Sequence, residues 1–124
     1  MQVLPSDYIE SFLEFFKDSK EEYEQNIQEV WKHDKKKQDQ LHDMEFADNY
    51  KERCKIATRI HNERVQRRQY KDRAEMVEEI AAFYSDKKNK PFFDGLKSLL
   101  EKQKATEQYL MHERHYNRRG GDVE

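Results

Sequence analysis

The chain has 124 residues and a mass of 15.2 kDa, so one domain is expected, because a second would lack residues for its own core. Charged residues make up 40% and hydrophobic residues 35%, while three glycines and two prolines are too few for the turns of a β-sandwich or barrel. The 12% aromatic content separates the chain from disordered sequences. The composition therefore predicts an all-α protein of long charged helices with narrow apolar stripes.

The first predicted helix follows Pro5 and continues to a short polar segment at 46–49, where a tight helix–helix turn is expected. Ser6 or Asp7 can cap this helix, with Glu10 completing a capping box with Asp7. Apolar residues recur every seven positions, and a second row is shifted by four, which predicts one apolar stripe. The first row is Ile9, Phe16, Tyr23, Val30 and Met44, with Lys37 in the missing position, and the second row is Leu13, Ile27 and Leu41.

The second predicted helix spans about 48–86, and a polar run ending in Pro91 predicts the next connection. Its stripe follows steps of three and four if Glu63 and Arg67 are counted as polar members. A third helix follows Pro91, and 120–124 is expected to be a flexible tail after a single helical domain over 1–119. The stripe of the second helix is Ile56, Ile60, Tyr70, Ala74, Val77, Ala81 and Tyr84; that of the third is Phe92, Phe93, Leu96, Leu99, Leu100, Ala105, Tyr109 and Leu110.

The predicted fold is a long antiparallel helical hairpin with a shorter third helix packed across it, a coiled-coil-like bundle. Both long helices carry polar residues in the middle of their stripes, so antiparallel pairing would form a charged seam; solvated charge on an exposed hairpin is the alternative. A polar contact is also predicted between His42 with Glu45 and the group Arg67, Arg68 and Asp72. The seam residues are His33, Asp34 and Lys37 on the first helix and Glu63, Arg64, Arg67 and Arg68 on the second.

Charge is distributed unevenly along the chain. Residues 1–29 hold eight acidic and two basic side chains, whereas 47–73 hold four acidic and nine basic ones. Such a basic segment is typical of nucleic-acid binding, but the isoelectric point of about 6.2 favours ion pairs within or between protein chains. The apolar core also looks thin for one chain, so self-association or a protein partner is expected to complete it. The arginines concerned are Arg59, Arg64, Arg67, Arg68 and Arg73.

No arrangement of residues indicates catalysis, and no cofactor or metal is expected. Cys54 is the single cysteine, so neither a disulfide within the chain nor a thiolate metal cage is possible. His112 and His115 lie three residues apart, whereas zinc chelation by this kind of helix needs a separation of four. No signal peptide or run of eighteen apolar residues is present, which predicts a cytoplasmic protein without membrane contact.

Four segments share a pattern with a known group of proteins: Lys37 to Phe46, Tyr50-Lys51, Arg64 to Asp72, and Glu113 to Arg119. The chain resembles small helical accessory proteins encoded by bacteriophages of Gram-positive bacteria. Those proteins typically read Asp-x-Leu-His-x-x-Glu in the first long helix, a basic string ending in Lys-Asp-Glu in the second, and Arg-x-Tyr-x-Pro-Arg at the end. The match covers roughly two-thirds of the chain and departs at Arg73 and at Arg118, where the group has glutamate and proline.

This resemblance implies a phage accessory protein without an assigned enzymatic activity, acting in the host bacterial cytoplasm. We expect a non-enzymatic protein that binds and modulates, by inhibition above all, a host, competitor or phage protein such as a defence complex or a repressor. The alternative is a helical nucleic-acid-binding protein of phage replication or packaging. The predicted partner-binding residues are Trp31, Arg64, Arg67, Arg68, Arg114, Tyr116, Arg118 and Arg119.

Overall fold

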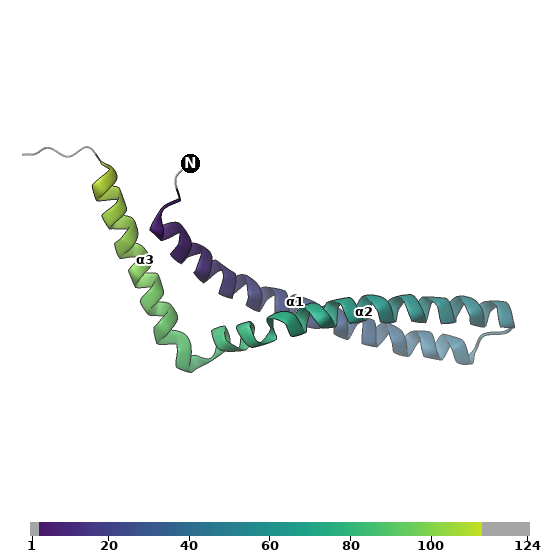
Figure 1. The fold of residues 1–124 in the computed structure, drawn as a ribbon. Coiled ribbons are helices and arrows are strands. Elements are labelled where there is room, and N and C mark those ends of the chain that lie inside the picture. The colour runs from purple at the N-terminus through teal and green to yellow at the C-terminus, as the bar shows by residue number, and fades with distance from the viewer. Residues whose placement is uncertain (1–2, 113–124) are drawn as a thin grey trace, which may run out of the picture. The chain divides into compact units, whose positions relative to one another are not determined.

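The computed structural model describes residues 3–112 and contains three α-helices: α1 (Pro5–Glu45), α2 (Tyr50–Ser85) and α3 (Lys90–Met111). A 3₁₀ turn, η1 (Lys87–Asn89), lies between α2 and α3. No strand occurs in the described residues, and α1 and α2 form a long antiparallel hairpin with α3 as the shorter third helix (Figure 1). The predicted fold class is therefore confirmed. The predicted tail at 120–124 and four site residues lie outside the described residues: Arg114, Tyr116, Arg118 and Arg119.

The chain divides into two compact units, which we describe separately. The hairpin unit is Phe15–Lys90 and holds most of α1, all of α2 and η1. The terminal unit is Met1–Glu14 with Pro91–Glu124, of which 3–14 and 91–112 are described. In the terminal unit the first turns of α1 pack against α3.

The start of α1 differs by a turn fraction from the expected capping box. The helix begins at Pro5, where a missing N–H costs no hydrogen bond, and Ser6 already lies inside it. The Asp7 carboxylate accepts the backbone N–H of Leu4 at 2.8 Å, while Asp7 N–H donates to the Leu4 carbonyl at 3.0 Å. Asp7 is thus the acidic partner of the box rather than the cap, and Glu10 instead pairs with Lys104.

Both connections lie where polar residues predict them. Asn49 caps α2, because its side chain accepts the Glu52 backbone N–H at 2.9 Å. Asp86 ends α2 in an extended conformation, and its side chain then accepts the Lys88 N–H at 3.0 Å to shape η1. Pro91 is accommodated in the first turn of α3, where no intrahelical N–H is required.

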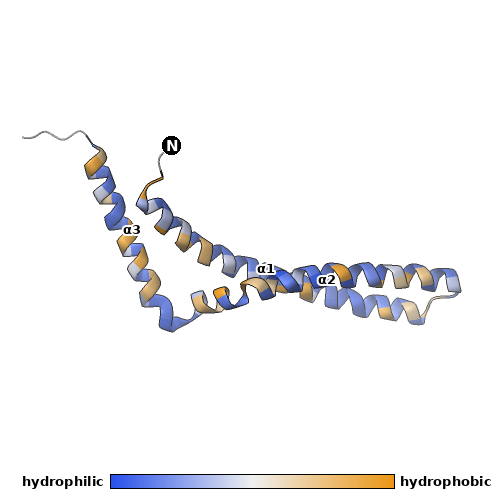
Figure 2. Cartoon of the chain, viewed as in Figure 1, coloured by the Kyte–Doolittle hydropathy of each residue, from blue (hydrophilic) through white to orange (hydrophobic). Residues whose placement is uncertain are grey.

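The inward face of α2 follows the predicted row closely. Its buried or half-buried positions are Ile56, Ile60, Glu63, Arg67, Tyr70, Ala74, Val77, Ile80, Ala81 and Tyr84. Across the hairpin, the Phe16 ring of α1 lies 6.3 Å from the ring of Tyr84 and 5.9 Å from that of Phe83. Hydropathy colouring shows that hydrophilic residues dominate both hairpin helices and that apolar patches are short (Figure 2). The core of the hairpin is therefore a narrow line of side chains.

The second inward row of α1 is polar, which the apolar pattern did not predict. The buried or half-buried residues are Ser19, Asn26, His33 and Gln40, seven positions apart, whereas Leu41 is 49% exposed. The rows of a coiled coil are separated by steps of three and four, and here the step from Phe16 is three rather than four. The Ser19 and Asn26 side chains donate to the carbonyls one helical turn earlier, at 2.7 Å and 2.8 Å.

In the terminal unit, Glu107 of α3 holds the first turn of α1. One carboxylate oxygen accepts the Ser6 backbone N–H at 2.9 Å and the other accepts the Ser6 hydroxyl at 2.5 Å. Gln103 donates to the same carboxylate at 3.1 Å, and Lys104 forms an ion pair with Glu10 at 3.4 Å. The Ser6 hydroxyl hydrogen bond is the main cause that lowers the pKa of Glu107.

The stripe of α3 is shifted from the predicted one. Its buried or half-buried residues are Phe93, Leu96, Leu100, Gln103 and Glu107, in steps of three and four. The predicted members Phe92, Leu99, Tyr109 and Leu110 are exposed. The last two inward positions are polar because they meet the backbone and polar side chains at the start of α1.

Candidate functional site

The predicted charged seam is present in the middle of the hairpin. His33 is 6% exposed and its Nδ1 pairs with the Glu63 carboxylate of α2. The His33 ring also stacks on Tyr70, with centroids 5.6 Å apart and an angle of 28°. Lys36 lies 3.9 Å from the second oxygen of Glu63. This pairing replaces apolar packing where both stripes are interrupted, so the alternative of wholly solvated charge is wrong for His33 and Glu63.

A second ion pair joins the two helices at the edge of the seam. Arg67 Nε donates to Asp34 Oδ1 at 2.6 Å, with the side chains 35% and 45% exposed. The sequence analysis places Arg67 and Asp34 in this seam, and the structure brings them together. Because both remain open to solvent, the pair fixes the register of the hairpin more than it adds stability.

The predicted contact of His42 and Glu45 with Arg67 and Arg68 is wrong. In an antiparallel hairpin, residues pair when they lie at similar distances from the turn, and Arg67 is already level with Asp34. Glu45 is the last residue of α1 and therefore lies level with the first turns of α2. His42 contacts its own neighbour, with its ring 4.8 Å from that of Phe46.

Three of the predicted arginines line one groove between α1 and α2, which we call the arginine groove. Its volume is about 570 Å³, and Arg67 is the member that is held by an ion pair across the hairpin. Five of the lining side chains are basic and three are acidic, so the groove carries a net positive charge without excluding carboxylates. The lining residues are Asp34, Lys37, Arg64, Arg67, Arg68, Lys71, Asp72 and Glu75.

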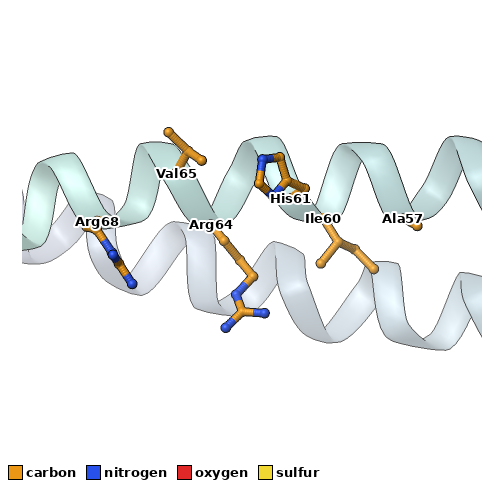
Figure 3. Close-up of a pocket in the computed structure, with 6 residues that line it drawn as sticks. All are labelled: Ala57, Ile60, His61, Arg64, Val65 and Arg68. Atoms are coloured by element: carbon orange, nitrogen blue, oxygen red, sulfur yellow. The ribbon is translucent and has the colours of Figure 1, made fainter.

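A neighbouring pocket of about 410 Å³ extends the arginine groove along α2 toward the turn, because Arg64 and Arg68 line both. Figure 3 shows the side chains of Arg64 and Ile60 reaching toward α1, while Val65 points away from it. The pocket adds aliphatic surface beside the charged groups. Its lining residues are Ala57, Ile60, His61, Arg64, Val65 and Arg68.

Trp31 lies beside the arginine groove and is 65% exposed, so it is a surface residue and not part of the core. It precedes Asp34 by three residues, which places both on one side of α1. The sequence singled out Arg64, Arg67, Arg68 and Trp31 but missed Lys71 and Glu75. The steps of four, three and four that connect Arg64, Arg68, Lys71 and Glu75 were the available signal.

The chemistry of the described residues is that of a binding surface. Within residues 3–112, no group of three or more histidine, cysteine, aspartate and glutamate side chains could hold a metal ion. Cys54 is exposed on α2, in a separate pocket formed with Lys51, Lys55, Thr58 and Arg59. None of the described helices has the length and apolar character needed to span a membrane.

In comparisons with known proteins, no family model, no curated protein and no solved structure matches the chain.

Proposed function

We propose that this chain is a non-enzymatic accessory protein that binds a partner protein through the arginine groove and modulates it. The observation that carries the proposal is the convergence of Arg64, Arg67 and Arg68 with exposed Trp31 on one side of a helical hairpin. Arginine and tryptophan are the residue types that most often supply binding energy at protein interfaces. A long charged hairpin offers such residues on a firm scaffold without requiring any cofactor.

The mixture of charges in the groove favours a protein partner. Asp34 already neutralises Arg67, and Asp72 and Glu75 lie among the remaining basic side chains. A phosphate backbone would be repelled by these carboxylates, whereas a protein surface can present both signs of charge in matching positions. The groove thus suits a partner with an acidic surface that also carries some basic side chains.

Nucleic-acid binding is the second candidate, because five basic side chains converge in the arginine groove. Binding of this kind depends steeply on salt, since each neutralised phosphate releases counterions. Retention on heparin that falls steeply between about 0.05 M and about 0.2 M salt would favour it. Retention that is weak at the lower salt concentration would favour the protein partner.

The resemblance to phage accessory proteins suggests where the partner belongs. We propose that it is a host, competitor or phage protein in the bacterial cytoplasm, such as a defence complex or a repressor, and that binding inhibits it. The support is the four segments of similar sequence, of which Lys37 to Phe46 and Arg64 to Asp72 include residues of the arginine groove.

Affinity capture from host lysate with matched variants tests the proposed function. The double variant Arg64→Glu with Arg68→Glu reverses two charges in the groove, and Arg53→Glu with Arg59→Glu makes the same charge change elsewhere on α2. We expect a specific protein to be retained by the wild type and by the control variant but lost with the groove variant. Equal retention by all three would overturn the assignment of the groove.

A further inference from the structure

One edge of α2 carries a charge pattern that is complementary to itself when it is reversed. Arg64, Arg68, Lys71, Glu75 and Glu78 follow one another in steps of four, three, four and three, and all five are exposed. This spacing places them along one side of the helix. The edge therefore reads as three basic residues followed by two acidic ones; we call these five residues the charged edge.

Within one chain this order is unfavourable. Arg64 and Arg68 lie four residues apart, Arg68 and Lys71 three apart, and Glu75 and Glu78 three apart, so like charges face each other along the helix surface. Within residues 3–112, the ion pairs that the structure shows join other side chains and none of these five. An opposing surface with the reverse order would turn these repulsions into ion pairs.

We propose that the charged edge is a self-association surface that binds a second copy of this chain in antiparallel orientation. In that arrangement Arg64 lies opposite Glu78 of the second copy, and Arg68 lies opposite Glu75 of the second copy. The pairs recur on the other side of a two-fold axis near Lys71, as an isologous dimer requires. Each dimer thus forms four ion pairs from two kinds of contact.

Trp31 of α1 lies at the same level as this axis. Because Asp34 pairs with Arg67 in an antiparallel hairpin, a residue three positions before Asp34 is level with a residue about three positions beyond Arg67. Asp34 and Lys37 line the arginine groove together with the charged edge, so Trp31 lies on that side as well. Two copies related by the axis bring their exposed indole rings toward each other, which adds an apolar centre to a charged rim.

The self-association does not rest on the proposed function, because the purified chain alone is sufficient to measure it. Arg64 and Arg68 belong both to the charged edge and to the arginine groove. A partner protein and a second copy therefore compete for these arginines when both are present. Failure of one proposal leaves the other measurable.

Two charge-reversal variants of the full chain test the dimer. Arg64→Glu with Arg68→Glu makes the edge mostly acidic, and Glu75→Arg with Glu78→Arg makes it wholly basic. We expect sedimentation velocity to give twice the 15.2 kDa mass for the wild type and the single mass for each variant alone. An equimolar mixture of the two variants should restore the doubled mass, because every position of one edge then faces the opposite charge.

Circular dichroism checks that each variant keeps its helix content, and Arg53→Glu with Arg59→Glu is the matched control, expected to remain dimeric. The wild type supplies a readout without substitution, because the dimer should dissociate as salt rises from about 0.05 M to about 0.5 M. A wild type that is monomeric at low salt overturns the proposal. So does a dimer that persists in either variant alone, or a variant mixture that stays monomeric.

Discussion

Glu107 satisfies backbone and hydroxyl donors of a helix start that is distant in the sequence. The first N–H groups of any helix lack intrahelical acceptors, and a carboxylate there is favoured by the positive end of the helix dipole. Glu107 accepts from both the backbone and the hydroxyl of Ser6, and Gln103 holds it from the next turn of α3. The charged form of Glu107 is thereby stabilised, and its pKa is lowered.

The stability of the terminal unit should therefore decrease at acid pH. A carboxyl group whose pKa is lower in the folded state stabilises the fold above its unfolded pKa and loses that contribution as pH falls through the folded value. We expect Glu107→Gln to lower stability at pH 7 and to narrow the difference in stability between pH 7 and pH 3. Thermal unfolding of both proteins at each pH measures this. An equal loss of stability on acidification in the wild type and the variant would contradict it.

Gly95 is a site where a single methyl group should stabilise α3. It lies inside the helix, and a Cβ added there would meet no atom within 4 Å. Glycine in a helix interior is less favourable than alanine by about 0.5–1 kcal/mol, because its backbone loses more conformational freedom on folding. Gly95→Ala should raise the free energy of unfolding by about that amount, measured by urea titration. A lower stability would mean that the space around Gly95 is occupied.

At the scale of the helices, the inward row of α2 could be predicted because apolar residues continue it on both sides of its polar members. Glu63 and Arg67 fall in the same steps of three and four as Ile60 and Tyr70. The second row of α1 could not be predicted, since residues such as Ser19 and Asn26 give no hydropathy signal. Their burial depends on the step that the hairpin register selects.

The register also explains why the predicted charged seam is correct while the contact of Glu45 with Arg68 is wrong. The seam followed from interruptions of both stripes at matching distances from the turn at 46–49. The Glu45 contact followed from segments of family resemblance, which carry no information about distance from the turn. Asp34 and Arg67 meet the distance requirement, and they form the ion pair.

Two double-mutant cycles distinguish the observed pair from the excluded one. Asp34→Ala and Arg67→Ala should show a coupling energy of about 0.3–1 kcal/mol, because both side chains are partly exposed and solvent weakens the pair. Glu45→Ala and Arg68→Ala should be additive, since the hairpin keeps these residues apart. The free energy of unfolding of each single and double variant provides the measurement. Coupling in the second cycle and none in the first would require a different register.

For the chain as a whole, the charge asymmetry was evident in the sequence, but the face that carries it was not. Arg59, Arg64 and Arg67 lie close together in sequence, yet Arg59 lines a pocket with Cys54, and only the other two line the arginine groove. Helical periodicity separates residues by direction, but the direction of the groove depends on how α1 packs on α2. Trp31 had two interpretations, core or interface, and the exposure that decides between them depends on the hairpin register.

The last prediction follows from a protein that binds rather than catalyses. Trp31→Ala should weaken partner binding by roughly 30-fold or more, since a central tryptophan typically contributes about 2 kcal/mol or more at an interface. Cys54→Ala and His42→Ala should leave binding unchanged, because both side chains are exposed and lie outside the arginine groove. Tyr50→Ala is the matched control, as it removes an aromatic ring that is 79% exposed at the start of α2.

The affinity of each variant for the captured partner, measured by titration at fixed salt, gives the comparison. Wild-type affinity in Trp31→Ala, together with a lost biological effect in Cys54→Ala or His42→Ala at unchanged thermal stability, would overturn the binding interpretation. That combination would place a reactive thiol or imidazole at the centre of the function, and the surface around Cys54 or His42 would then be the site to study. Loss of binding in Trp31→Ala alone would instead define the centre of the interface, because the control removes an aromatic ring without reaching the groove.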